Sequence, residues 1–420
     1  MKPTSDSELI QLRSAICDTS IALSEAAVQA LLEPLDYPSV DLAFVPGDRL
    51  VIALHDNLPN PFGILTPILD WLIRQLDPKN VSITVVISEN HHAFPKQLAK
   101  WLADHHPSKS LVSQEELRQR ETVGSDTDPA NSDGDSSAGD SSDEIRVVVY
   151  SPDEPQSLEY IAASDNAEPM YLQRELVEAD FVIPIYRWLE PSDPRGPDPY
   201  VVLPAFADGP TKLQYAKQWL MQSPASSTRS WSQQTGWLLG VQFTVGVVLN
   251  HDGQVGMLAA GNPESVAQAC SQAVVSKHTS AAVQALDLVV VRIILPDLSE
   301  GSRGTRWDEV ASAAWIAEKW LSPTGRIVVV ADKLMVATEG ISSLASDEPD
   351  AELIQELLSG PIEDAFPAAL LRSVQSRRSI YLQCQVDPET LESLGFASIA
   401  NAAQLERLIN GAGRVGVLEY

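Results

Sequence analysis

The sequence has few cysteines, few aromatic residues and no long hydrophobic run. Its three cysteines, Cys17, Cys270 and Cys384, are odd in number and far apart, which predicts reduced, packed thiols and no disulfide framework. No apolar run approaches the roughly 20 residues that a membrane helix needs. The beginning of the chain also lacks the charged and then apolar pattern of a secretion signal. We therefore expect a cytoplasmic protein.

Positive charge is scarce as well. Lys and Arg number 29 against 57 Asp and Glu, so the formal net charge is −28. A field of this sign repels the phosphates of nucleic acids and of anionic membrane surfaces, and neither is an expected partner. No predicted strand is followed by a P-loop or a GxGxxG turn, which disfavours nucleotide binding by those two routes.

The chain is long enough for two folded domains. It has 420 residues, of which 44% are hydrophobic, as expected of a globular protein. Residues 121–144 differ from the rest, because they hold eight acidic side chains and no basic one. This composition predicts a disordered acidic insertion, which is either merely solvated or a docking segment for basic partners.

Strand-like runs alternate with helical patterns in the first half. Residues 49–56 and 81–90 are strand-like and flank a helical pattern at 61–77, which together predict a βαβ unit. Two later strand-like runs flank residues 157–179, which we predict to be helical. Near-continuous apolar strands of this kind predict a mainly parallel sheet with helices on both faces, with function at the carboxyl ends of its strands.

From residue 241 the pattern restarts. Two strand-like runs surround an Asp252-Gly253 turn, which is a strong hairpin signal. Helical and strand-like patterns then alternate to residue 420. We therefore predict an α/β fold of two domains, 1–240 and 241–420, each with a mainly parallel sheet flanked by helices, and a cleft between the two.

Polar loops follow several of the predicted strands. In residues 55–61, Asp56 can bind a hydroxyl or a basic group, although Asp56 and Asn57 equally suit the cap of the next helix. After the next strand, His91 and His92 can supply an acid/base group or a metal ligand, or they form a surface pair without function.

Two further loops carry charged side chains. Residues 186–210 form a long proline-rich segment, which is typical of a binding loop or a lid. In residues 297–315, Ser302, Arg303 and Arg306 can bind an anion near the start of the next helix. The alternative is that Arg306 pairs with Asp308 at the surface.

Several blocks resemble the nickel-pincer lactate racemase family in order and spacing. They include PGDRLVIALHDNLPNPFGIL at 46–65, SITVVISENHH at 82–92, EADFVIPIYRW at 178–188 and the hairpin and helix at 243–270. The resemblance implies two α/β domains around a cleft that holds a nickel-pincer nucleotide, tethered to a lysine and with a histidine on the nickel. It also implies racemisation of lactate or another 2-hydroxy acid, with histidines that shuttle a proton.

The first two motifs of that family are only partly conserved in this sequence. Its Asp-x-Thr-Arg-Pro loop falls on residues 56–60, where Asp56 keeps the acid while leucine and proline replace the hydroxyl and the guanidinium. Its Gly-x-His-Arg turn falls on residues 89–92. This alignment keeps an acid/base histidine at His91 and puts His92 in place of the arginine, as a candidate substrate-binding residue.

The central signature departs further. Aligned through Pro204, the second proton-transfer histidine becomes Glu190 and the tethering lysine becomes Tyr200, while the nickel-ligand histidine falls near Tyr215. A phenol cannot form the amine-derived tether of the family. Lys212 is the nearby amine, twelve residues beyond Tyr200.

In the second half, the family's Gln and Lys fall on about Asp308 and Ala311, so a substrate-facing cation is lost. We therefore expect a scaffold that closes over a small carboxylic ligand, with the nickel-pincer nucleotide absent or not covalently bound. One alternative is an active 2-hydroxy acid racemase that uses His91, His92, Glu190 and Lys212. Another is an interaction or structural protein whose acidic insertion recruits partners.

Overall fold

The fold is known from a computed structural model. It describes residues 8–12, 16–58, 60–88, 93–113, 143–164, 167–190, 192–196, 200–221, 227–274, 285–294, 305–331, 333–360 and 362–420. Most of the predicted acidic insertion, 121–142, lies outside these ranges. Among the described helices, none combines the length and the apolar character that crossing a membrane requires.

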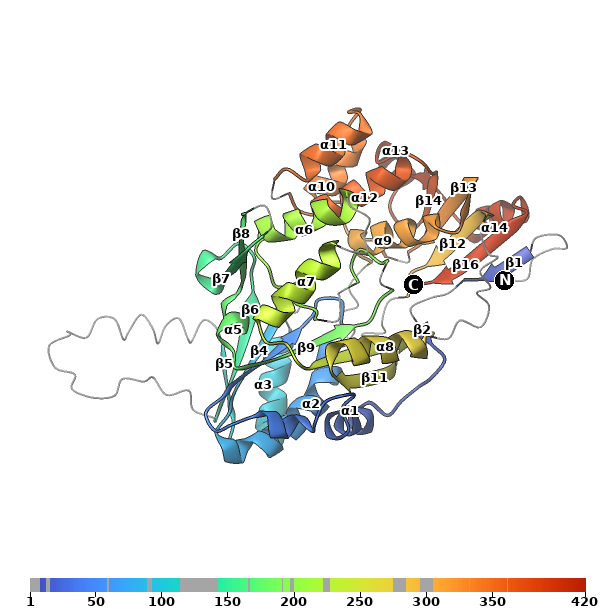
Figure 1. Ribbon diagram of the computed structural model, residues 1–420. Coiled ribbons are helices and arrows are strands. Elements are labelled where there is room, and N and C mark those ends of the chain that lie inside the picture. The colour runs from blue at the N-terminus through green and yellow to red at the C-terminus, as the bar shows by residue number, and fades with distance from the viewer. Residues whose placement is uncertain are drawn as a thin grey trace.

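The first sheet has eight strands in the order β11-β10-β9-β3-β4-β6-β5, with β2 beside β10 (Figure 1). Neighbouring strands are parallel except for β10 and β11, which form the hairpin predicted around Gly253. Its strands are β2 (Ile16–Cys17), β3 (Arg49–Leu54), β4 (Ser82–Ser88), β5 (Ser110–Ser113), β6 (Glu144–Tyr150), β9 (Phe181–Arg187), β10 (Thr244–Asn250) and β11 (Val255–Gly261).

The second sheet has six strands, all parallel to their neighbours, in the order β1-β16-β12-β13-β14-β15. The predicted α/β fold with mainly parallel sheets is therefore confirmed. Its strands are β1 (Glu8–Gln11), β12 (Leu286–Arg292), β13 (Leu321–Val330), β14 (Ile380–Gln383), β15 (Ala397–Ser398) and β16 (Arg414–Glu419).

Helices flank both sheets (Figure 1). They are α1 (Leu23–Leu32), α2 (Pro61–Leu76), α3 (Phe94–His105), α5 (Arg174–Glu178), α6 (Gly209–Met221), α7 (Ser227–Leu238), α8 (Pro263–Ala273), α9 (Trp307–Glu318), α10 (Glu339–Ser342), α11 (Asp350–Leu357), α12 (Ala365–Gln375), α13 (Pro388–Ser393) and α14 (Ala402–Asn410).

The unit β3-α2-β4 shows how the sequence builds the first sheet. Pro61 opens α2, and the side chain of Asn60 accepts a hydrogen bond from the Gly63 amide at 3.0 Å. Asn60, and neither Asp56 nor Asn57, is therefore the cap of this helix. Buried residues recur at helical spacing and cover one face of the sheet: Ile64, Leu65, Ile68, Leu69 and Leu72.

The opposite face of the first sheet is continuous with the core of the second. One hydrophobic cluster holds Val51 and Val182 from the first sheet together with Val289 and Val329 from the second. The contact passes through α6, where the Trp219 ring lies 5.0 Å from Trp315 on α9 and 5.9 Å from Phe366 on α12. Large apolar side chains on α6, α9 and α12 thus join the cores of the two sheets.

The helix predicted at residues 157–179 is wrong. The chain there forms an antiparallel pair, β7 (Leu158–Ala163) and β8 (Pro169–Gln173), and only the short α5 is helical. Tyr160 and Tyr171 face each other across the pair with ring centroids 5.9 Å apart. This cross-strand aromatic contact, with Pro169 in the middle of the segment, favours the hairpin over a helix.

The two sheets do not divide at residue 240. The β10-β11 hairpin belongs to the first sheet, because β10 pairs with β9, and the second sheet resumes only at β12. Conversely, β1 pairs with β16 in the second sheet. The domain boundary was predicted at residue 240 because the alternation of strand-like and helical patterns begins again there. Such a pattern does not reveal which sheet the following hairpin joins.

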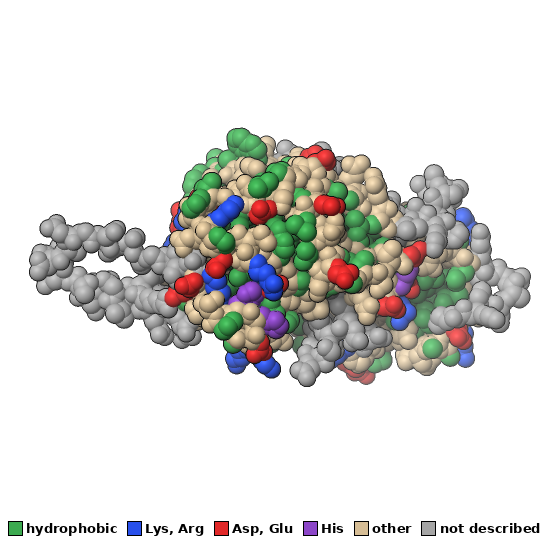
Figure 2. Space-filling view, turned by 90° about the horizontal axis from the view of Figure 1, so that it is seen from below, with side chains coloured by type: hydrophobic (Ala, Val, Ile, Leu, Met, Phe, Trp, Pro, Cys, Tyr) green, Lys and Arg blue, Asp and Glu red, His purple; other side chains and the backbone are tan. Residues whose placement is uncertain are grey.

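The lower face of the molecule carries charges of both signs. Figure 2 shows acidic, basic and hydrophobic side chains interspersed there. Among the described residues on this face, no continuous patch of one sign forms.

A histidine bridges the two sheets at the surface. His251, in the β10-β11 turn, places Nε2 3.0 Å from Oδ1 of Asp18 and Nδ1 2.6 Å from Oε2 of Glu419 on β16. Hydrogen bonds to Glu419 and then Asp18 raise the pKa of His251 above its usual value. The side chain is 49% exposed, so solvent limits the strength of the contact.

We predict that this bridge stabilises the protein below pH 6 and is lost at alkaline pH. A raised folded-state pKa means that protonated His251 favours folding, fully so below the unfolded-state pKa near 6.5, and the effect fades as pH rises through the folded value. Chemical denaturation should show His251→Gln less stable by up to about 1 kcal/mol at pH 5.5 and equal to wild type at pH 9. An equal difference at both pH values would contradict the ionic role.

Candidate functional site

The carboxyl ends of several parallel strands meet at one edge of the first sheet. The order of the sheet reverses at β3, because β4 lies on one side of it and β9 on the other. In open α/β sheets, ligands bind outside the strand ends at such a reversal. Asp56 follows β3, Ser88 ends β4, Tyr150 ends β6 and Arg187 ends β9.

A cavity of about 160 Å³ lies at these strand ends. It is lined by Leu54, Asp56, Ser88, Tyr150, Pro152, Ala205, Phe206 and Lys212. The Nζ of Lys212 lies 4.7 Å from the centroid of the Tyr150 ring, a cation–π contact that holds the amine at the wall. The Ser88 hydroxyl is enclosed and has no hydrogen-bond partner among the described residues. The sequence thus brings a carboxylate, an amine and a hydroxyl to one cavity.

Asp56 is held as a carboxylate. Burial opposes its ionisation, but His55, Arg306 and Lys212 together keep the pKa of this carboxyl well below its usual range. Oδ1 lies 2.9 Å from Nδ1 of the buried His55, and Oδ2 lies 3.5 Å from Nη1 of Arg306. The Asp56 side chain is 40% exposed, so it remains accessible to a small molecule.

Arg306 joins the first sheet to the helix α9 of the second. Its Nε and Nη2 donate to the two oxygens of Asp308 at 3.0 and 2.8 Å, and its backbone amide donates to Glu309 at 2.8 Å. Its side chain is only 16% exposed. Asp308 and Asp56 raise the pKa of Arg306 despite burial, so it stays charged. The predicted pairing with Asp308 is confirmed, but the pair lies between the sheets and not at the surface.

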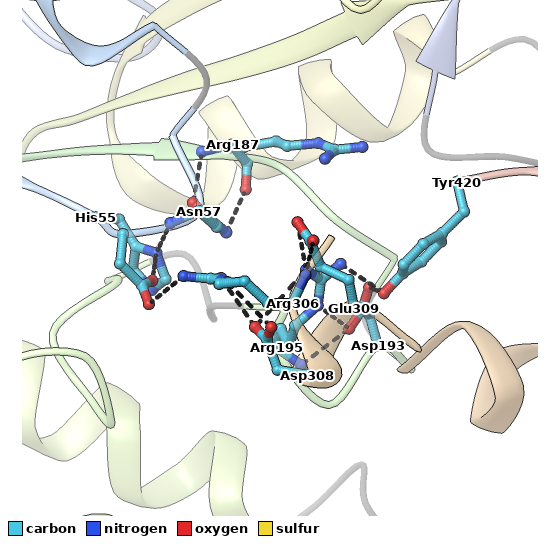
Figure 3. A network of polar contacts seen from close by, with 10 residues as sticks. His55, Asn57, Arg187, Asp193, Arg195, Arg306, Asp308, Glu309 and Tyr420 are labelled. Carbon is cyan, nitrogen blue, oxygen red and sulfur yellow. Dashed lines mark hydrogen bonds and ion pairs between the residues drawn. The ribbon is translucent and has the colours of Figure 1, made fainter. Parts of the chain in front are cut away.

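A second arginine lies deeper in the same region (Figure 3). The Nη2 of Arg195 donates to the Tyr420 hydroxyl at 2.6 Å, and its Nη1 lies 3.7 Å from Oε1 of Glu309. The Tyr420 hydroxyl in turn donates to Asp193, whose side chain is 1% exposed. Burial lowers the pKa of Arg195, but Tyr420, Asp193, Asp308 and Glu309 raise it well above its usual value.

Asn57 ties the loop after β3 to the end of β9. Its Nδ2 donates to the carbonyl of Arg187 at 3.2 Å, and its Oδ1 accepts from the amide of Arg187 at 3.2 Å. The side chain of Asn57 therefore completes the backbone hydrogen bonding of a strand end. Figure 3 shows this pair beside the Arg306 network.

The aligned tether and ligand positions do not fit a nickel-pincer nucleotide. Tyr200 carries a phenol and packs against α7, where a Cβ added at Gly236 would lie 2.5 Å from its ring. Tyr215 is buried and its ring lies 6.3 Å from that of Trp231, nearly parallel to it. Neither side chain offers the amine or the imidazole that the family's attachment uses. Lys212 does offer an amine, and it lines the cavity with Asp56.

The other predicted site residues have different outcomes. Glu190 is half-buried and its carbonyl accepts from the Asp193 amide at 2.8 Å, but its side chain does not line the cavity. His91, His92, Ser302 and Arg303 lie outside the described residues.

Sequence reasoning missed several polar groups of this region, namely Ser88, Tyr150, Arg187, Glu309 and Tyr420. A signal for Ser88 and Arg187 was present, because each is a polar residue that ends a nearly continuous apolar strand.

Comparisons with known proteins bear on the fold. The sequence matches no protein-family model and no curated protein. Among solved structures, the lactate racemase apoprotein from Thermoanaerobacterium thermosaccharolyticum is similar, with a TM-score of 0.66, 15% identity and coverage of 96% of this chain and 92% of that one. A protein from Thermotoga maritima has a TM-score of 0.55, 11% identity and coverage of 90% and 91%. The chain therefore has a lactate-racemase-like fold.

We predict that Asp56 and Arg306 are energetically coupled across the two sheets. A double-mutant cycle with Asp56→Asn and Arg306→Gln should give a coupling free energy of about 1 kcal/mol or more at pH 7, measured by chemical denaturation. Asp347→Asn, at an exposed position, is the matched control and should change stability by less than about 0.5 kcal/mol. Additive effects of the two substitutions would contradict the coupling.

Proposed function

We propose that this protein binds a small carboxylic acid, of the 2-hydroxy acid type, at the strand-end cavity, on a lactate-racemase-like scaffold without the tethered nickel-pincer nucleotide. One observation carries the proposal: Asp56 and Lys212 line the same cavity of about 160 Å³, together with the enclosed hydroxyl of Ser88. An ammonium group pairs with a carboxylate ligand, and the Asp56 carboxylate accepts a hydrogen bond from a ligand hydroxyl.

The size of the cavity limits the ligand. A volume of about 160 Å³ suits a molecule of a few heavy atoms. The apolar walls formed by Leu54, Pro152 and Phe206 suit a short carbon chain. Compact hydroxy acids combine such a chain with the two polar groups that Lys212 and Asp56 recognise.

The loss of the tether supports a non-catalytic or altered role. The phenol of Tyr200 cannot replace a lysine amine, and Arg306 is already engaged by Asp56 and Asp308. Two carboxylates thus already engage Arg306, so it is not the group that binds the ligand. We infer that the protein binds a small carboxylic acid but does not racemise it by the chemistry of the family.

A second candidate is an active 2-hydroxy acid racemase in which the cofactor is attached elsewhere. The observation in its favour is the position of Lys212, whose amine lies in the cavity although it is twelve residues from Tyr200. In that case Glu190 and the histidines at 91 and 92 would be the proton-transfer candidates.

Ligand binding is tested by thermal unfolding with lactate and glycerate. We expect millimolar concentrations to raise the Tm of the wild type by roughly 2 °C or more, because a ligand that binds only the folded state stabilises it. Lys212→Gln should abolish the rise. Lys217→Gln, on the same helix but not in the cavity wall, should leave it intact. Equal shifts in both variants would overturn this site.

The state of the cofactor is tested by intact-mass and nickel measurements. After expression beside the enzymes that make the nickel-pincer nucleotide, we expect the unmodified mass and no stoichiometric nickel. Lys212→Arg is the matched variant. An added mass on the wild type that disappears in Lys212→Arg would refute the proposal and establish the second candidate.

A further inference from the structure

Arg187 is a buried cation whose guanidinium takes no part in the hydrogen bonds and ion pairs around Arg195 and Arg306. The residue is 8% exposed, and its Nε is enclosed with no hydrogen-bond partner. Among the described residues, no carboxylate forms an ion pair with its guanidinium. Figure 3 shows the side chain alongside the cluster of Arg195 and Glu309, with no contact drawn to its guanidinium.

The structural role of this position does not need an arginine. The two hydrogen bonds to Asn57 involve only the backbone amide and carbonyl of Arg187. Any residue except proline at the end of β9 would supply them. The backbone hydrogen bonds at the end of β9 therefore do not account for the presence of a guanidinium at this position.

The guanidinium stays charged where it lies. Burial and the nearby Arg195 lower the pKa of Arg187 to about 10, although Tyr420, Glu309 and Asp193 act in the opposite direction. A pKa of this size still leaves it protonated at neutral pH. A buried cation without a close partner is costly, and an anionic ligand at this position would offset that cost.

The acids nearest to Arg187 already have other partners. Asp193 accepts from the Tyr420 hydroxyl and from the backbone amide of Arg195. Glu309 accepts from the backbone amide of Arg306 and lies 3.7 Å from Arg195. These contacts of the two acids are therefore directed to Tyr420 and to the segments of Arg195 and Arg306, and none of them is directed to the Arg187 guanidinium.

We propose that Arg187 binds a small monoanionic carboxylate that enters from solution at the end of β9. Four cations in this region, Lys212 and the arginines at 187, 195 and 306, lie near four acids, Asp56, Asp193, Asp308 and Glu309. Because these charges already balance, a dianion such as phosphate adds a larger excess of negative charge than a carboxylate does. A guanidinium also matches the planar carboxylate in a bidentate geometry.

This site is separate from the strand-end cavity. Arg187 does not line that cavity, and its charged neighbours come from the loop after β9, from α9 and from Tyr420 next to β16. The inference therefore goes beyond the proposed function, and each can fail without the other.

The test uses ¹³C-labelled acetate and the full chain, with binding measured by NMR saturation transfer at constant ionic strength. We expect Arg187→Gln to weaken acetate binding at least about tenfold, as expected when a hydrogen-bonded charge pair is lost. Without acetate, this variant should be at least as stable as the wild type, because an uncompensated buried charge has been removed. Arg292→Gln, at an exposed position, is the matched control and should bind acetate as the wild type does.

Two further variants make every outcome decisive. Arg187→Lys keeps the charge and loses the bidentate geometry, so it should bind acetate with intermediate affinity, even if Arg187→Gln does not fold. Lys212→Gln should retain acetate binding at Arg187, which separates this site from the cavity. No detectable acetate binding to the wild type, or equal binding to the wild type and Arg187→Lys, would overturn the proposal, as would inhibition by phosphate at equal concentration.

Discussion

The contact of Arg306 with Asp56 and Asp308 is the interaction on which the site depends. It joins a loop at the end of β3 to the beginning of α9, two segments 250 residues apart in the chain. Because all three side chains are partly shielded from water, their attraction is stronger than that of a surface pair. Together with His55 and Lys212, the same contact keeps Asp56 ionised beside the cavity, so it contributes both to the geometry between the sheets and to the chemistry of the site.

Local patterns were sufficient for most of the fold. The βαβ unit around α2, the hairpin at Gly253 and the parallel strands follow from the spacing of apolar residues and from turn residues, which act over a few positions. The pair β7-β8 was mistaken for a helix because its strand pairing, which includes the contact between Tyr160 and Tyr171, joins residues that a local pattern does not relate to each other. Sheet membership of the hairpin was likewise hidden, since it is decided by the pairing of β10 with β9.

The site was predictable only in part, for a physical reason. Asp56, Arg306 and Asp308 were singled out as charged residues in or beside loops, and Lys212 as the amine nearest to Tyr200 in the family alignment. The structure places Lys212 in the same cavity as Asp56, and Arg306 in contact with both Asp56 and Asp308. Which charges meet depends on contacts between segments far apart in sequence. The sequence marks Arg187 only as a polar residue at the end of an apolar strand, and the lack of a partner for its guanidinium depends on what surrounds it in the fold. The shared fold at 15% identity does not supply this information either.

The pairing of β1 with β16 has a topological consequence. The chain passes between the two sheets twice, once from β1 to β2 and once from α8 to β12. The second sheet is therefore discontinuous in the sequence, because β1 precedes the whole of the first sheet and its other five strands follow it. The strands of the first sheet are in effect one continuous insertion into the second, so the second sheet can be completed only after the first has been synthesised.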